Sequence, residues 1–204
     1  MTEREVIPTR SAFLDLKEER VGMQEGYRFL DEKRLILAAV ILVTLNTYTQ
    51  ELAAFRADYA AAGQALRAAI ARHGIEGLSL YPPAEAAKGE VRVQERSVLG
   101  VRVQETLWPE VQAAGAEPPQ APDRSPEGDA CRDAFRRLIP RTLRLADLVA
   151  NLERLRAEYA RTARRARAME DVLLPEIDNT LSAIDTALEE LEREEAVRVR
   201  RAAG

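Results

Sequence analysis

The chain has 204 residues, of which 31% are charged and only 5% aromatic. A chain rich in Ala, Leu, Glu and Arg with so few aromatic residues is typical of long helices and not of an ordinary globular domain. The net charge of −4, with both signs interspersed, argues against a nucleic-acid-binding protein. The single cysteine, Cys131, excludes an internal disulfide, fits a reducing compartment and is expected to be a small helix residue.

The first predicted helix covers roughly residues 11–73. Thr9 or Ser11 can serve as its N-cap, and no proline interrupts it. From Leu37 onward, apolar residues recur at steps of mostly three and four, so one stripe stays on one side of the helix. Gly74 follows the last periodic residues and is the expected end of the helix. About sixty helical residues would make a rod of roughly 90 Å.

An apolar run, LILAAVILVTL, occupies residues 35–45 of this helix. It is shorter than the about 20 residues that a membrane-spanning helix needs. We therefore expect it to form buried helix core, and an interfacial segment is the less favoured alternative. The N-terminal residues are polar, and we expect no signal peptide.

Residues 74–127 have a different character, because glycine, proline and short β-prone runs appear. Residues 90–96 and 101–105 alternate valine with polar side chains, with Gly100 between them, which predicts a β-hairpin. Residues 115–126 are rich in proline and predict an extended linker. Two breaks flank the hairpin, at Tyr81-Pro82-Pro83 and at Trp108-Pro109. A hairpin this small must pack on the helices or on another protein.

The second predicted helix begins at Ser125-Pro126-Glu127, which places an N-cap, an N1 proline and a first-turn acid in the preferred order. We expect Pro140 to break or bend it. Pro175 lies in its most regular apolar stretch, where it removes one backbone hydrogen bond at a cost of about 3 kcal/mol. A kink or bulge is therefore expected at Pro175.

Both helices carry apolar residues at near-heptad spacing, which is typical of a coiled-coil seam. A seam this narrow cannot be buried by one helix alone, so each helix needs a partner, and antiparallel pairing of the two is the simplest way to bury both seams. The predicted fold is mainly α: a long antiparallel two-helix coiled coil with a small β-hairpin module between its helices. The expected divisions are residues 1–73, 74–127 and 128–204. The seam is assigned to Leu37, Ile41, Leu52, Phe55, Leu152, Leu155, Ile177, Leu181, Ile184, Leu188 and Leu191.

Motifs for catalysis are absent from the sequence. His73 is the only histidine, so a His-based triad, dyad or metal cluster is not expected, and its place at a helix end favours a capping role. Neither GxxxxGK[ST] nor GxGxxG occurs. We expect no catalytic residues, no cofactor and no metal. The arginines at 161, 164, 165 and 167 favour a solvated face or an acidic protein partner over phosphate or nucleic acid.

Four segments of the sequence resemble the D subunit of the V-type (V/A-type) ATPases, the central rotor shaft. They are Pro8-Thr9-Arg10 with Leu14, Leu16 and Lys17; the stretch from Gly26 to Arg34; Ser97-Val98-Leu99-Gly100-Val101; and the C-terminal stretch with Arg164-Arg165, Ala168-Met169-Glu170, Pro175, Asn179-Thr180, Glu192 to Glu195 and Arg198. Asp31 and Leu35 depart from the lysine and the aspartate that the family usually has there. Pro140 and the proline-rich linker are also atypical, which suggests a divergent bacterial member.

The resemblance implies a non-catalytic shaft that transmits torque between the catalytic ring and a membrane ring that moves H⁺ or Na⁺. It implies as partners the catalytic and nucleotide-binding ring subunits, the small F subunit of the central stalk and a membrane-coupling central-stalk subunit. It implies a cytoplasmic position, peripheral to the inner membrane, without nucleic acid and without membrane insertion. The tip inside the ring would carry Arg4, Arg10, Lys17, Arg198, Arg200 and Arg201.

Three other interpretations compete with this one. The gamma subunit of F-type ATPases has a larger α/β domain between its helices than the fifty-odd residues available here. A stand-alone coiled-coil scaffold or adaptor would not need the hairpin signature or a proline within the seam. An arginine-rich nucleic-acid binder conflicts with the acidic balance of the chain.

Overall fold

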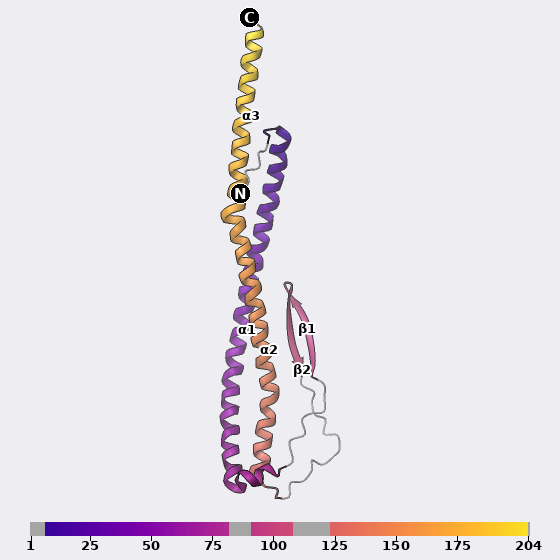
Figure 1. The fold of residues 1–204 in the computed structure, drawn as a ribbon, viewed down its shortest axis with the longest axis vertical. Helices are drawn as coiled ribbons and strands as arrows, with labels where there is room; N and C mark the ends of the chain where they lie inside the picture. The colour runs from indigo at the N-terminus through magenta and orange to yellow at the C-terminus, as the bar shows by residue number, and fades with distance from the viewer. Residues whose placement is uncertain (1–6, 82–90, 108–122, 204) are drawn as a thin grey trace. The chain divides into compact units, whose positions relative to one another are not determined.

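The computed structural model describes residues 7–81, 91–107 and 123–203. Its elements in chain order are helix α1 (Arg10–Ser79), strands β1 (Arg92–Val98) and β2 (Val101–Leu107), helix α2 (Pro126–Ala168), the π-helical turn η1 (Met169–Leu173) and helix α3 (Leu174–Ala202). Figure 1 labels the helices and strands. The fold is mainly α, with two long helical runs that pack together and a small antiparallel sheet between them, as predicted.

Some predicted features lie outside the described residues. These are Arg4, the prolines at 82 and 83, Glu90, Trp108-Pro109 and residues 115–122 of the linker.

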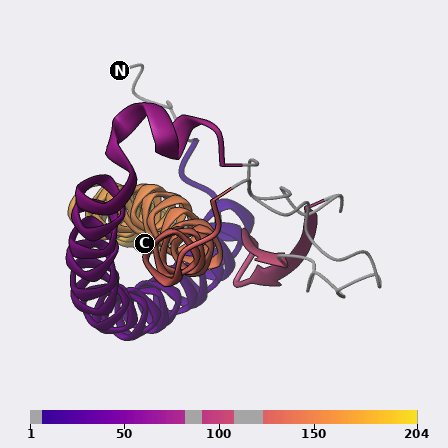
Figure 2. The ribbon, with the colours of Figure 1, turned by 90° about the horizontal axis from the view of Figure 1, so that it is seen from below.

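The ends of α1 follow from two residues. Thr9 is the N-cap, because its Oγ1 accepts a hydrogen bond from the N–H of Ala12 at 3.2 Å. Gly74 interrupts the regular helix with φ 70° and ψ 170°, a conformation that favours glycine. The predicted helix end is therefore confirmed at this point. The chain then makes a short further helical stretch in a new direction, which Figure 2 shows from below.

Strands β1 and β2 form a hairpin in which Val98 pairs with Val101. The two residues of its loop, Leu99 and Gly100, both have positive φ, at 52° and 83°. Two successive positive φ angles are characteristic of the type I′ turn, whose twist matches that of the strands. The predicted hairpin is confirmed, and its strands run to Val98 and to Leu107 instead of ending at residues 96 and 105.

The chain forms two compact units, one of residues 1–37 with 159–204 and the other of residues 38–158. In the second unit, α1 and α2 pack through a core of Ala62, Ala134 and Leu138. Arg141 of α2 joins this packing electrostatically, because its guanidinium lies 2.8 Å from the carboxylate of Asp58 and 3.5 Å from that of Glu51.

The first unit is also an antiparallel helix pair. Arg10 at the start of α1 forms an ion pair with Glu192 at 3.0 Å, and Arg20 forms one with Asp178 at 2.5 Å. Later residues of α1 therefore pair with earlier residues of α3, so the two helices run antiparallel. Farther along, a Cβ on Gly26 would lie only 3.0 Å from Cε of Met169, so glycine permits a close approach beside η1.

The two prolines of the C-terminal helical run behave differently. Of the two outcomes expected at Pro140, a break or a bend, the break is wrong, because α2 continues through it from residue 126 to 168. A proline removes only one backbone hydrogen bond, and the buried side chains of Ala134 and Leu138 just before it hold the helix in its packing. The bulge expected at Pro175 is confirmed. The π-helical turn 169–173 precedes it, with the N–H of Leu174 bonded to the carbonyl of Met169.

Candidate functional surfaces

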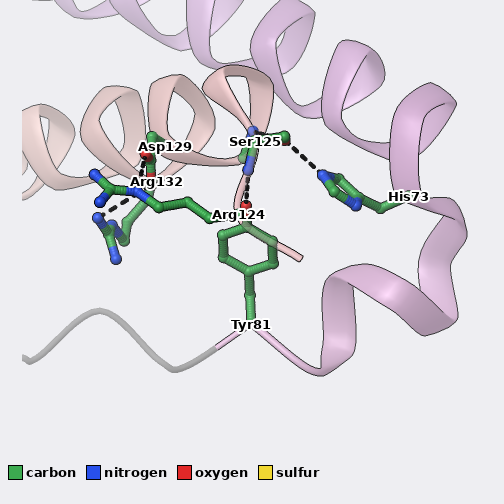
Figure 3. Close-up of polar contacts among 7 residues, drawn as sticks. His73, Tyr81, Arg124, Ser125, Asp129 and Arg132 are labelled. Carbon is green, nitrogen blue, oxygen red and sulfur yellow. Dashed lines mark hydrogen bonds and ion pairs between the residues drawn. The ribbon is translucent and has the colours of Figure 1, made fainter. Parts of the chain in front are cut away.

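The polar clasp at the end of the α1–α2 pair is built around Ser125, the N-cap of α2. Its Oγ accepts a hydrogen bond from the N–H of Gly128 at 3.1 Å and lies 2.5 Å from Nε2 of His73. Its own N–H donates to the hydroxyl of Tyr81 at 2.7 Å. Figure 3 shows His73 and Tyr81 approaching Ser125 from the two segments on either side of Gly74. The clasp therefore ties the end of α1 to the start of α2.

The contacts of His73 superficially resemble those of a catalytic triad. Its Nδ1 lies 3.5 Å from the carboxylate of Asp123, while its Nε2 meets Ser125. However, the side chain of His73 is only 3% exposed and Ser125 is 5% exposed, and the Ser125 hydroxyl already caps a helix. A substrate could not reach this oxygen without unpacking the clasp. His73 thus joins two helices, and it does so through the cap of α2 instead of by capping α1.

Next to the clasp, Asp129 holds two arginines of its own segment. Its carboxylate accepts from Nε of Arg124 at 2.8 Å and lies 3.3 Å from Arg132. Figure 3 includes all three side chains. Acidic side chains in the first turn of a helix also complement its dipole, so Asp129 stabilises the start of α2 in two ways.

The hairpin is fastened to α2 by a polar ladder that sequence reasoning missed: Asp147, Asn151 and Arg154. Asn151 donates through Nδ2 to the carbonyl of Gln104 at 2.7 Å and accepts from the N–H of Gln104 at 2.8 Å. Arg154 donates to the Gln104 side chain at 2.8 Å. The side chain of Asn151 therefore bonds the outer edge of β2 as a neighbouring strand would.

Asp147 completes the ladder one helical turn before Asn151. It is 7% exposed, and its two carboxylate oxygens accept hydrogen bonds from the N–H of Thr106 at 2.5 Å and from its hydroxyl at 2.8 Å. The side-chain amide of Gln104 also donates a hydrogen bond to Asp147, at 3.1 Å. A buried carboxylate needs such donors to replace water. The signal available in the sequence was only polar residues at positions i, i+4 and i+7, which a solvated helix face would show equally.

The predicted seam residues lie in two separate units. In the described chain, Leu37 and Leu155 are fully buried, and Ile177 and Ile184 are also buried. Six further seam residues are half-buried: Ile41, Leu52, Phe55, Leu152, Leu181 and Leu188. Leu191 is 52% exposed, which corrects its assignment to the seam. It lies beside Glu192, whose partner Arg10 is the first residue of α1, so the helix that would cover it is only beginning there.

Five of the predicted tip residues lie in the described part of the chain, and these five are not gathered into one cluster. Arg10 is paired with Glu192, Lys17 lies 4.4 Å from the ring centre of Phe13, and Arg198 lies 3.8 Å from Glu194 on its own helix. Arg200 and Arg201 stand in the last turn of α3. Their exposure on the surface leaves them accessible to a partner.

The apolar run 35–45 was expected to be helix core, and this expectation is wrong for most of it. Leu37 is buried, whereas Leu42 and Val43 are 66% and 69% exposed, and Leu35 and Ile36 are exposed too. A helix with one partner can bury only one face. An 18-residue window of α1 is also apolar enough to cross a membrane by length and composition, and 6% of it is buried. Such residues mark a surface that another molecule can cover.

Two titratable groups in the described part of the chain, Tyr27 and Cys131, have raised pKa values. A hydrogen bond to Glu170, together with burial and the charge of Glu170, raises the pKa of Tyr27. Burial raises the pKa of the Cys131 thiol, which makes it a poor nucleophile. Over residues 7–81, 91–107 and 123–203, no three His, Cys, Asp or Glu side chains are grouped to hold a metal ion. The features that stand out are surfaces for other macromolecules.

Comparison with known proteins gives a consistent result over nearly the whole chain. A family model described as the ATP synthase D subunit matches residues 12–204. The A-type ATP synthase D subunit of Pyrococcus furiosus is 30% identical over 200 residues, covering 96% of this chain and 92% of that protein. The V-type ATP synthase D subunit of Thermotoga neapolitana is 27% identical, with 96% of both chains covered. The A-type counterpart from Methanosarcina acetivorans is 26% identical, covering 98% of this chain and 97% of that protein.

Proposed function

Because this chain belongs to the D-subunit family of ATP synthases, we propose that it is the central rotor shaft of a V/A-type rotary ATPase. In this role it transmits torque between the catalytic ring and the ring that moves ions across the membrane. The observation that carries the proposal is the antiparallel helix pair found in each unit, fastened by packing and by ion pairs between helices.

The helix pairs are suited to transmitting torque. A single helix twists and bends easily, whereas two helices joined at several levels resist twist because each junction must shear. Arg20 and Asp178 provide such a junction in one unit, and Arg141 with Asp58 provides one in the other. Within the second unit, buried residues such as Leu155 add close packing to this junction.

The shaft itself performs no catalysis in this proposal. Its chemistry-bearing side chains, His73 and Ser125 above all, are used to hold helices together. ATP hydrolysis then belongs to the ring subunits. The chain purified alone should show no ATPase activity, and clear turnover that is lost on mutation of this chain would contradict the proposal.

The partners are the catalytic and nucleotide-binding ring subunits, the small F subunit of the central stalk and a membrane-coupling central-stalk subunit. Two kinds of surface support a multi-subunit setting. The exposed apolar side chains of α1, such as Leu42 and Val43, fit an apolar partner surface. The exposed arginines of the tip, Arg198, Arg200 and Arg201, fit acidic surfaces inside the ring. In this role the chain lies in the cytoplasm at the inner membrane.

Reconstitution tests the proposal. A catalytic ring assembled without this chain is mixed with the full chain, and binding and ATP-driven ion transport are measured after addition of the membrane ring. Binding together with restored transport is expected. A chain that does not bind the ring, but forms homodimers or binds unrelated proteins, would favour a coiled-coil scaffold or adaptor instead.

A further inference from the structure

The seam of the C-terminal helical run contains one residue more than its repeat requires. In a coiled-coil seam, the residues that face the partner helix recur at alternating steps of three and four. Two sets of buried and half-buried residues in the first unit follow this rule, one on each side of η1. The set before η1 is Tyr159, Thr162, Ala166 and Met169. The set after η1 is Leu174, Ile177, Leu181, Ile184 and Leu188.

The extra residue lies within η1 itself. The two sets are joined by a step of five residues, from Met169 to Leu174, where the alternation requires four. A step of five is one turn of a π-helix, and the N–H of Leu174 bonds to the carbonyl of Met169 accordingly. In an unbroken α-helix, one extra residue would rotate Ile177 and Ile184 out of the seam by about 100°. η1 therefore absorbs the extra residue and keeps both sets facing α1.

Pro175 favours η1 but does not suffice to produce it. Both prolines of the run lack the N–H that an α-helix requires. Yet α2 continues through Pro140 as α-helix. The seam there runs through Leu138, Arg141 and Leu145 at steps of three and four, so it has no residue in excess. The repeat of the seam, and not proline alone, thus determines where the π-turn forms.

The turn that absorbs the extra residue is held weakly from within. None of residues 169–173, all of which the structure describes, is buried, and Val172 and Leu173 are 42% and 38% exposed. Pro175 has no N–H, so one carbonyl of the turn receives no helical hydrogen bond. Segments with few buried side chains and missing hydrogen bonds open at the lowest cost in free energy. We therefore expect η1 to open more easily than the α-helix on either side of it.

Two contacts tie η1 to α1. Met169 lies so close to Gly26 that a Cβ on this glycine would be 3.0 Å from its Cε. The residues that follow these two, Tyr27 and Glu170, are joined by a hydrogen bond between their side chains. Of the two contacts only the hydrogen bond is directional, so it fixes the rotational position of the turn.

We propose that η1 is a torsional joint built into the helix pair. The extra residue prevents the run from closing into continuous α-helix, so the turn stays open to small rotations of α3 about its axis. The hydrogen bond between Tyr27 and Glu170 is the catch that limits these rotations. The mechanical use of the joint rests on the proposed function, under which torque passes along this run, whereas its origin in the seam repeat does not.

Variants of the full chain separate the effect of the repeat from that of the proline. Pro175→Ala alone keeps the extra residue, so its crystal structure should still show the π-turn. Deletion of Val172 in the Pro175→Ala chain removes the excess, and the run should become continuous α-helix. The melting temperature should then rise by about 2–4 °C over that of Pro175→Ala alone. The amide of Leu174 should exchange about tenfold more slowly, which corresponds to about 1.4 kcal/mol.

Deletion of Asn179 in the Pro175→Ala chain is the matched control. Asn179 is exposed, and its loss shortens the run by the same one residue. With η1 still in place, this deletion moves Leu181 and Ile184 out of the seam, so the melting temperature should fall. Loss of the π-turn in Pro175→Ala would overturn the inference, because proline would then be its cause. Equal melting temperatures of the two deletion variants would overturn it as well.

The catch is tested in the complex with the catalytic ring. Tyr27→Phe keeps the aromatic ring and removes the hydroxyl that bonds to Glu170. With the catalytic ring immobilised and nucleotide absent, the angular spread of a probe on the hairpin turn should widen in Tyr27→Phe. It should narrow in the Pro175→Ala chain that lacks Val172. The same spread in both variants and the unaltered chain would refute the joint. An unaltered chain that fails to bind the catalytic ring would refute the proposed function instead, and the measurements on the free chain would still decide the origin of η1.

Discussion

Asn151 of α2 pairs with the main chain of Gln104 in β2 through both of its amide atoms, at 2.7 and 2.8 Å. A helix side chain thus takes the position that the backbone of a third strand would occupy. The hairpin is attached to the helix by directional bonds, and it need not rely on the small apolar area of Val101 and Val103 alone. A hairpin of two strands is marginal in isolation, so this attachment determines whether it keeps its place.

Replacing Asp147 by asparagine should loosen the hairpin. Both carboxylate oxygens of Asp147 accept hydrogen bonds from Thr106. In asparagine an NH₂ group replaces one of these oxygens, so it would face a hydrogen-bond donor and could not accept the bond. We expect a loss of about 1–3 kcal/mol in the stability of the hairpin attachment. Amide hydrogen exchange of Thr106 should speed up, since its N–H loses its acceptor. Asn179→Asp, an exposed position on α3, is the matched control. Unchanged protection at Thr106 would show that the ladder does not hold the hairpin.

Burial along α3 predicts a contrast between two seam positions. Ile184→Ala removes a side chain that is 4% exposed and should lower the free energy of unfolding by about 2–5 kcal/mol. Leu191→Ala, at the exposed end, should change it by less than about 1 kcal/mol. Urea unfolding followed by circular dichroism measures both. Equal losses at the two positions would mean that the seam continues through Leu191.

Two glycines of α1 should respond differently to alanine. Gly22 has open space around it, so Gly22→Ala should stabilise the helix by about 0.5–1 kcal/mol. Gly26→Ala places its Cβ 3.0 Å from the end of Met169, which must move. The gain in stability from Gly26→Ala should therefore be smaller than at Gly22, or become a loss. Adding Met169→Ala to the same chain should restore the gain. Thermal unfolding of the three variants decides the matter. A gain at Gly26 as large as at Gly22 would show that the close approach beside η1 imposes no constraint.

The pKa of Tyr27 is raised by its hydrogen bond to Glu170, then by burial and by the negative charge of that residue. The phenol is therefore favoured in the folded state. Its contribution to stability is present below the pKa of the unfolded chain, about 10, and is lost as pH rises through the higher folded value. Ultraviolet titration of phenolate in the folded chain, minus that of Tyr27→Phe, should show late ionisation. Glu170→Gln should bring it back toward normal. An unshifted difference curve contradicts the contact.

The sequence predicted the elements of the fold well, because helices and turns have local causes. The N-cap Ser125, the glycine at 74 and the alternating valines around Gly100 each act within a few residues of themselves. Pro175 predicted a bulge for the same reason, since proline affects the hydrogen bond of its own turn. The break considered at Pro140 did not occur, because tertiary packing outweighs the loss of one backbone hydrogen bond.

The surfaces were harder to predict, because they depend on which residues meet across the fold. The side chains of Asp147 and Asn151 bind backbone atoms of β2. Backbone atoms are the same in every residue type, so the sequence carries no sign of which strand these side chains bind. Leu42 and Val43 look like core in a hydrophobic run, and only the single partner helix leaves them exposed.

The central claim is that this chain turns as the shaft of the complex. It is tested most directly by a probe attached at the hairpin turn, through Leu99→Cys with Cys131 replaced by alanine, in the assembled and immobilised complex. On addition of ATP, we predict that the probe rotates in one direction in steps. A probe that stays fixed while the same complex hydrolyses ATP and transports ions would contradict the account.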